Sequence, residues 1–113
     1  MSAGTSSLIV ATANDIDGRP VQDYLGIVSA EAVVRTSVAT RRAARSPRRA
    51  RARYATFENR ICQARQEVID EMCKSAAELG ATAIIAVEIT YTHVPLAQGN
   101  VLIVSASGTA VTL

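Results

Sequence analysis

One amphipathic helix dominates the hydrophobic pattern of the chain. Thr56 is expected to cap its amino end, and Gly80 stands just past its last apolar residue, where a helix ends on a residue that tolerates positive φ. Pro47 is expected to interrupt any helix before it. The pattern therefore predicts a helix of about 24 residues, or about 36 Å. Apolar residues recur along it at intervals of three and four, the spacing of one helical face; they are Phe57, Ile61, Ala64, Val68, Met72, Ala76 and Leu79.

Two strands are predicted before this helix. Residues 8–13 form a short apolar run with β-branched residues, and the stretch 14–20 that follows carries turn residues. Residues 21–38 alternate between apolar and polar and predict a long strand with a bulge or bend at Gly26. A helix over 30–40, where Ala and Glu gather, is the alternative.

Two more strands are predicted after the helix, joined by a turn at 95–100 into a hairpin. In 81–94 one parity is apolar, which indicates an antiparallel strand with one face against the helix; the apolar set is Ala83, Ile85, Val87, Ile89, Tyr91 and His93. Residues 101–113 form the last strand. The order β-β-α-β-β predicts an α+β fold, with an antiparallel sheet of about four strands packed on one long helix.

The last strand is nearly free of charge on both of its faces. One helix covers one face of a small sheet, so the other face needs a further cover, and a second copy of the chain is the simplest one. We therefore expect a homo-oligomer whose interface uses Val101, Ile103, Val104, Ala106 and Val111.

Length and composition indicate one domain over residues 1–113 that acts in the cytoplasm. The longest apolar runs, such as 83–87, are a few residues, well short of the roughly 20 that cross a bilayer. The first fifteen residues lack the basic stretch and long apolar core of a secretory signal. Because the apolar runs are short, we expect no membrane partner. Cys62 and Cys73 lie too far apart on one helix to bridge each other, so we expect free thiols.

Charge is strongly segregated along the chain, although its net value is only +2. Residues 35–65 hold ten arginines and one acid, a net charge of +9, whereas the rest holds two basic and nine acidic residues, a net charge of −7. The basic residues concentrate in the insertion-like segment 35–53. This segment is either solvated or paired with the acidic body, or it binds nucleic acid or another polyanion through Arg41, Arg42, Arg45, Arg48, Arg49, Arg51 and Arg53.

Three stretches together resemble the YbjQ-like family of small bacterial and archaeal proteins, often labelled heavy-metal-binding. They read DGRPVQDYLGIVSAEAVV, AAELGATAIIAV and NVLIVSASGTAVTL, and the resemblance extends over residues 7–113. It implies a fold similar to dodecin-type subunits and a ring-shaped homopentamer. The segment SVATRRAARSPRRARARYAT departs from the family, whose members carry an aromatic-rich, partly apolar segment ending in Gly-Gly-Arg-Ser-Gly; only Arg53 and Phe57 match its arginine and tyrosine.

Candidate chemistry is sparse. One His, two Cys and scattered carboxylates make no recognisable metal motif, so Glu88 and His93 are weak candidates for a divalent heavy metal, gathered from several subunits if at all. No activating base stands beside a Ser or Cys in a known catalytic pattern, so we expect no enzyme. The preferred hypothesis is a non-enzymatic ring-forming protein of unknown ligand, with metal binding and polyanion binding as the alternatives.

Overall fold

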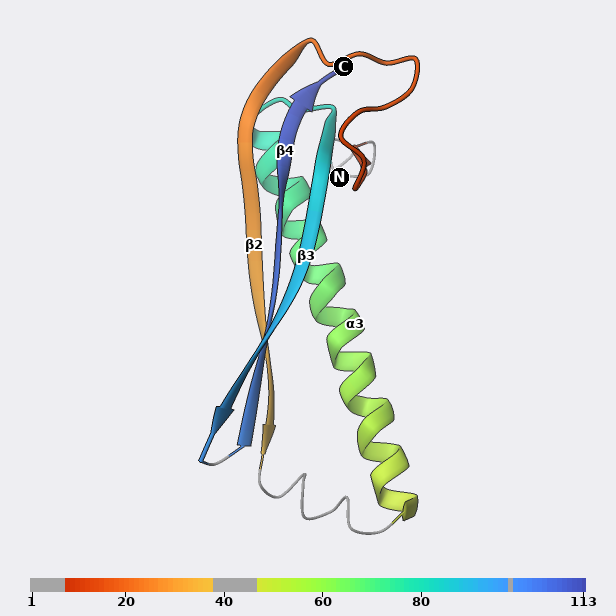
Figure 1. Ribbon diagram of the computed structural model, residues 1–113, viewed down its shortest axis with the longest axis vertical. Coiled ribbons are helices and arrows are strands. Elements are labelled where there is room, and N and C mark those ends of the chain that lie inside the picture. Colours follow the sequence, from red (N-terminus) through yellow and green to blue (C-terminus); the bar gives the residue numbers. More distant parts are fainter. Residues whose placement is uncertain (1–7, 38–46, 98) are drawn as a thin grey trace.

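The computed structural model describes residues 8–37, 47–97 and 99–113. It confirms an α+β fold with the order β-β-α-β-β, and the four strands form one sheet in the order β1-β3-β4-β2 (Figure 1). The elements are β1 (Ile9–Val10), β2 (Asp23–Ser37), α3 (Pro47–Glu78), β3 (Ala83–Leu96) and β4 (Gly99–Thr112). The last two strands form the predicted antiparallel hairpin.

The sheet is mixed, so the prediction of a purely antiparallel sheet was wrong. β2 and β3 are both antiparallel to β4, but β1 is parallel to β3, with Ile9 opposite Ala83. The cause is the path of the chain after β1. Residues 11–22 carry it to the opposite edge of the sheet, where β2 begins, so β1 and β2 are not joined as a hairpin.

The helix α3 is longer than its hydrophobic pattern predicted. It has 32 residues and begins at Pro47, so Thr56 lies inside it and is not its cap. Proline is well suited to the first position of a helix, because the missing N–H would have no partner there and its φ is already helical. The predicted end is confirmed, because Gly80 has a φ of 81°. No described part of α3 is apolar enough for a membrane span.

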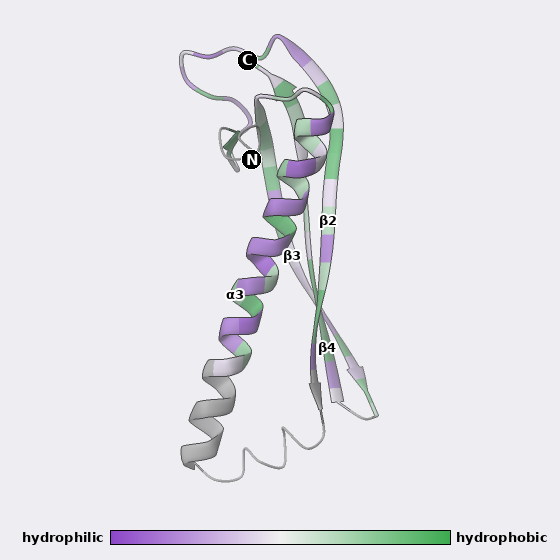
Figure 2. Ribbon diagram, turned by 180° about the vertical axis from the view of Figure 1, so that it is seen from behind, coloured by the Kyte–Doolittle hydropathy of each residue, from purple (hydrophilic) through white to green (hydrophobic). Residues whose placement is uncertain are grey.

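The main core lies between α3 and one face of the sheet, called here the helix face. The C-terminal turns of α3 lie over the sheet, whereas its N-terminal turns project away from it (Figure 1). The side of α3 turned to the viewer in Figure 2 is largely hydrophilic. Small and β-branched residues fill this core: Val28, Val34, Ala64, Val68, Met72, Cys73, Ala76, Ile84, Val87, Val104, Ala106 and Ala110.

A bulge in β3 corrects the predicted parity of this strand. The register with β4 shifts between Ile85 and Glu88, so Ala86 and Val87 together lie opposite Gly108. Ala86 has a φ of 54°, a left-handed conformation that is rare outside glycine. Ala83 and Ile85 therefore lie on the face opposite the helix, and only the residues from Val87 onward keep the predicted side. Alternation across a bulge restarts one residue later.

The N-terminal segment covers part of the other face of the sheet, called here the outer face. The covered part lies at the start of β3 and the end of β4. Ala83, Ile85 and Val111 are buried there beneath Ile9, Ile16 and Val21, with Leu113 beside them. The same segment binds the bulge, because the amides of Ala86 and Val87 donate to the carbonyls of Ala13 and Ala11 at 2.8 and 3.1 Å. The chain thus supplies its own cover for one end of this face.

The long strand β2 is confirmed, and the helical alternative over 30–40 is wrong up to Ser37, where the described residues of that stretch end. The bulge predicted at Gly26 is also present. The register with β4 shifts between Tyr24 and Gly26, and Gly26 has a φ of 137°. Glycine is required at this position because residues with a Cβ rarely adopt that φ.

Candidate functional site

The uncovered part of the outer face carries exposed apolar side chains among polar ones such as Glu31 and Glu88. Its rows run across three strands, with Val33 opposite Ile103 and Ile103 opposite Thr92. The next row joins Arg35, Val101 and Val94. Ile27 is 81% exposed and Val33 53% exposed, both on the strand at the edge of the sheet. Large apolar side chains this exposed favour a surface that another molecule covers.

The structure divides the predicted interface residues between the two faces. Val101 and Ile103 lie half-buried on the outer face. Val104 and Ala106 belong to the core under α3, and Val111 is buried beneath the N-terminal segment. The side chains of these three are packed inside the subunit, so they are removed from the predicted contact surface. Sequence parity had separated the faces of β4 correctly but had not shown which positions the chain itself covers.

The two metal-ligand candidates lie on opposite faces of β3. Glu88 is opposite Ser107, on the outer face, whereas His93 is opposite Leu102, on the helix face. Both are exposed. No group of three His, Cys, Asp or Glu side chains among the described residues is arranged to hold a metal ion. One subunit therefore does not bring Glu88 and His93 together as ligands.

A polar cluster that the sequence did not indicate lies where α3 meets β3. The Arg65 guanidinium donates one hydrogen bond from Nη1 to the Tyr91 hydroxyl at 3.1 Å and another from Nη2 to the Cys62 sulfur at 3.4 Å. The hydrogen bond with Tyr91, followed by the charges of Tyr91 and Cys62, raises the pKa of Arg65 above its ordinary value. Periodicity places Arg65 beside the apolar stripe of the helix, but no sequence pattern brings it to Tyr91.

The two thiols differ in accessibility. Cys62 is exposed and Cys73 is buried. Burial, with a smaller effect from the charge of Asp70, raises the pKa of the Cys73 thiol. A buried thiol of raised pKa is a poor nucleophile and metal ligand, so Cys73 acts as a small apolar core residue.

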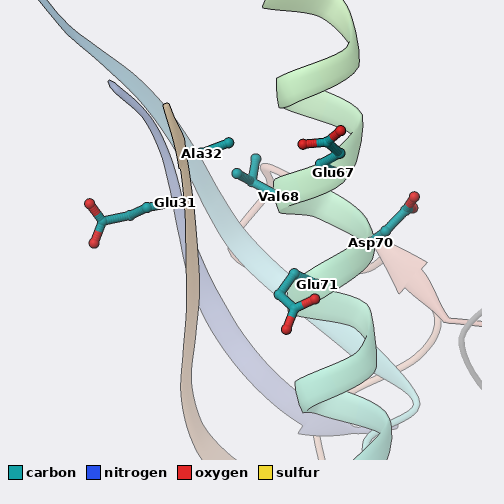
Figure 3. A pocket seen from close by; sticks show the side chains of 6 residues that line it. All are labelled: Glu31, Ala32, Glu67, Val68, Asp70 and Glu71. Atoms are coloured by element: carbon teal, nitrogen blue, oxygen red, sulfur yellow. The ribbon is translucent and has the colours of Figure 1, made fainter. Parts of the chain in front are cut away.

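A shallow acidic groove of about 540 Å³ lies between α3 and β2. Figure 3 shows Ala32 and Val68 directed towards each other, with Glu67 and Glu71 beside them on the helix. Glu31 points away from the helix, to the outer face (Figure 3). This part of the flank next to β2 is therefore acidic, whereas nearer the end of β2 Arg60 donates a hydrogen bond from Nη1 to the Arg35 carbonyl at 2.8 Å.

The arginine-rich segment is only partly within the described chain. Arg41, Arg42 and Arg45 lie outside the described residues. The other four belong to the first turns of α3, at the end of the helix that projects away from the sheet (Figure 1); they are Arg48, Arg49, Arg51 and Arg53. The first turn of the helix contains no acidic residue.

Comparisons with known proteins agree with the resemblance drawn from the sequence. The model of the YbjQ family, described as "Putative heavy-metal-binding", matches residues 8–113. The chain is 37% identical to a UPF0145 protein of Corynebacterium jeikeium over 105 residues, which are 93% of this chain and 98% of that protein. Its fold is similar to a crystal structure of a DUF74-family protein with unknown function from Pediococcus pentosaceus, with a TM-score of 0.61 and 17% identity over 94% of this chain and 97% of that one.

Proposed function

This chain belongs to the YbjQ family, and on that premise we propose that it is a non-enzymatic subunit of a closed homo-oligomeric ring. The resemblance to this family implies five subunits. The observation that carries the proposal is the exposure of large apolar side chains on the outer face. Ile27 and Val33 are largely exposed there, and Val101 and Ile103 are half-buried. A second copy of the same chain can cover these side chains, because other copies are always present wherever the protein is.

The arrangement of nucleophiles supports a role without catalysis. A nucleophilic Cys or Ser needs a base within hydrogen-bond reach. Among the described residues, the Cys62 sulfur is hydrogen-bonded to Arg65 and not to His93, and Cys73 is buried. The proposed role is therefore that of a scaffold that presents a repeated surface.

Substitutions that place a charge on the outer face test the assembly. Val33→Glu introduces a carboxylate beside Ile103, and Leu79→Glu makes the same change just after the end of α3, where Leu79 is 49% exposed. We expect the unmodified chain and Leu79→Glu to sediment at the same multiple of 11.9 kDa, and Val33→Glu to dissociate. Equal sedimentation of Val33→Glu and the unmodified chain contradicts the proposed role of this face.

A second candidate function, binding of a polyanion by the ring, is favoured by the position of the arginines. Arg48, Arg49, Arg51 and Arg53 lie in the first turns of α3, where the helix macrodipole is positive and no acid in the first turn offsets them. An anionic partner such as a nucleic-acid backbone stabilises both the dipole and the side-chain charges. A ring repeats this segment once per subunit, which raises the overall affinity.

A further inference from the structure

The strand β3 has a long edge without a backbone partner among the described residues. β1 pairs with it only at Ala83 and Ile84, and the N-terminal segment adds bonds to Ala86 and Val87. From 88 to 96 the side of β3 away from β4 faces no other described strand. An edge of this length exposes a row of N–H and C=O groups that natural proteins cover or blunt.

The direction of the exposed groups follows from one hydrogen bond. The amide of Val87 donates to Ala11, so it points away from β4. Successive residues of a strand direct their backbone groups to alternate sides. The N–H and C=O groups of Ile89, Tyr91 and His93 therefore point to the open edge. Pro95 has no N–H, and it ends this donor row near the turn.

The strand β2 forms the other open edge of the same sheet. Its 15 residues pair with β4 alone among the described strands, and its bulge lies near its beginning, between Tyr24 and Gly26. The stretch from Ile27 to Ser37 contains no proline and no bulge, two of the usual devices against edge pairing, and its charged residues are Glu31 and Arg35. Two of the exposed apolar side chains of the outer face, Ile27 and Val33, belong to this edge.

The helix carries different charges beside the two edges, although Arg60 also donates a hydrogen bond to the Arg35 carbonyl of β2 at 2.8 Å. Glu67 and Glu71 of α3 line the groove next to β2. Next to β3 the helix instead presents the Arg65 guanidinium, which is held by the Tyr91 hydroxyl. Pairing β2 with a second β2 brings Glu67 and Glu71 of both copies to one contact, whereas pairing β2 with β3 joins the edge beside Glu67 and Glu71 to the edge beside Arg65.

We infer that β2 of one copy of the chain pairs edge to edge with residues 88–96 of β3 in the next copy. Both strands are antiparallel to β4, so they run in the same direction and the new ladder is parallel. One kind of contact then covers both open edges, and the contact is heterologous, which generates a ring when the rotation closes. The inference rests on the proposed homo-oligomer and specifies how its subunits join.

Hydrogen–deuterium exchange of the assembled protein tests this pairing. In peptides that cover residues 88–94, both the even-numbered and the odd-numbered amides are expected to resist exchange. The even-numbered amides bond to β4, and those of Ile89, Tyr91 and His93 bond to the neighbouring copy. Fast exchange of that second set in a particle of multiple subunits overturns the pairing but leaves the homo-oligomer standing. If these amides are protected in a particle with the mass of one chain, another segment of the same chain covers the edge of β3. That result also overturns the pairing.

A pair of substitutions at His93 adds an independent readout. His93→Pro removes the outward N–H, whereas His93→Ala keeps it and removes only the exposed imidazole. We expect the concentration at which the assembly half dissociates to rise by about tenfold or more in His93→Pro relative to His93→Ala, the effect of removing one hydrogen bond at each interface. Equal dissociation of the two variants, with folding of each checked by circular dichroism, contradicts the inference. A single-chain mass of the unmodified protein contradicts the homo-oligomer itself.

Discussion

Gly108 lies so close to Ile84 that a Cβ built on Gly108 comes within 2.7 Å of the Ile84 Cγ2 atom. It also comes within 3.0 Å of Val87 Cγ2. This close approach exists because Gly108 lies opposite the bulge of β3, where Ala86 and Val87 together face one residue of β4. The glycine in NVLIVSASGTAVTL, one of the stretches that resemble the family, is thus explained by packing around the bulge.

Gly108→Ala should destabilise the fold, because the added methyl group displaces Ile84 or Val87 within a buried layer. We expect a decrease of about 1–3 kcal/mol in the free energy of unfolding, the usual range for overpacking, as measured by denaturant titration. Ser107→Ala is the matched control, because Ser107 lies half-buried on the outer face of the same strand. A decrease no greater than that of Ser107→Ala argues against the close approach.

The two cysteines should differ in reactivity under native conditions. Cys62 is exposed and should react with a thiol reagent in the folded protein, whereas Cys73 is buried and should react only after unfolding. Mass spectrometry of the labelled protein counts the modified thiols. The Cys62→Ala variant should therefore show no labelling until denaturant is added. Rapid labelling of that variant in buffer contradicts the burial of Cys73.

Alkaline pH should weaken the fold through Cys73. Its pKa is raised in the folded chain, so the folded state holds this proton more tightly than the unfolded state does. The stabilisation is complete below the unfolded thiol pKa of about 8.5 and disappears as pH rises through the folded value. The free energy of unfolding between about pH 8 and 10 should therefore fall more steeply in the unmodified chain than in Cys73→Ala. Parallel profiles refute this assignment.

Metal binding by a single subunit is not expected, because Glu88 and His93 lie on opposite faces of β3. Purified protein should contain zinc or copper at well below one ion per chain, and Glu88→Gln and His93→Ala should leave that content unchanged. Inductively coupled plasma mass spectrometry provides the measurement. A stoichiometric metal that disappears in both variants shows that assembly brings these residues together across subunits.

If the polyanion candidate holds, oligonucleotide affinity should depend steeply on salt and on the first turns of α3. Replacing Arg48, Arg49, Arg51 and Arg53 by Gln keeps residues that favour helix and removes four charges per chain. The slope of log affinity against log salt should become shallower by about 0.9 for each phosphate of duplex DNA that these arginines no longer neutralise. Arg19→Gln, outside this segment, is the control. Equal slopes in the two variants exclude this site.

Periodicity predicted the elements that repeat a simple pattern and missed those set by local exceptions. The stripe of α3 and the alternation of β4 are regular, so the helix, the hairpin and the two faces of the last strand followed from the sequence. The bulge at Ala86 carried no sequence signal, because the left-handed residue is not a glycine. Pro47 was read as a break, although proline also begins helices.

The candidate surfaces were predictable only in part, because they depend on how the elements pack together and not on the pattern within each element. An apolar strand indicates burial on both faces but does not identify the cover. The N-terminal segment hides Val111, and α3 hides Val104 and Ala106, so the chain itself buries three of the five residues assigned to an interface. The hydrogen bond between Arg65 and Tyr91 depends on the placement of α3 over the sheet, which neither local pattern specifies.

Native mass spectrometry of the intact assembly tests the central claim most directly, because it reports the number of subunits and any bound ligand together. The proposed ring predicts one dominant species at a closed multiple of the 11.9 kDa chain, five subunits by the family resemblance, at micromolar concentration. A well-folded particle with the mass of one chain at that concentration contradicts the account.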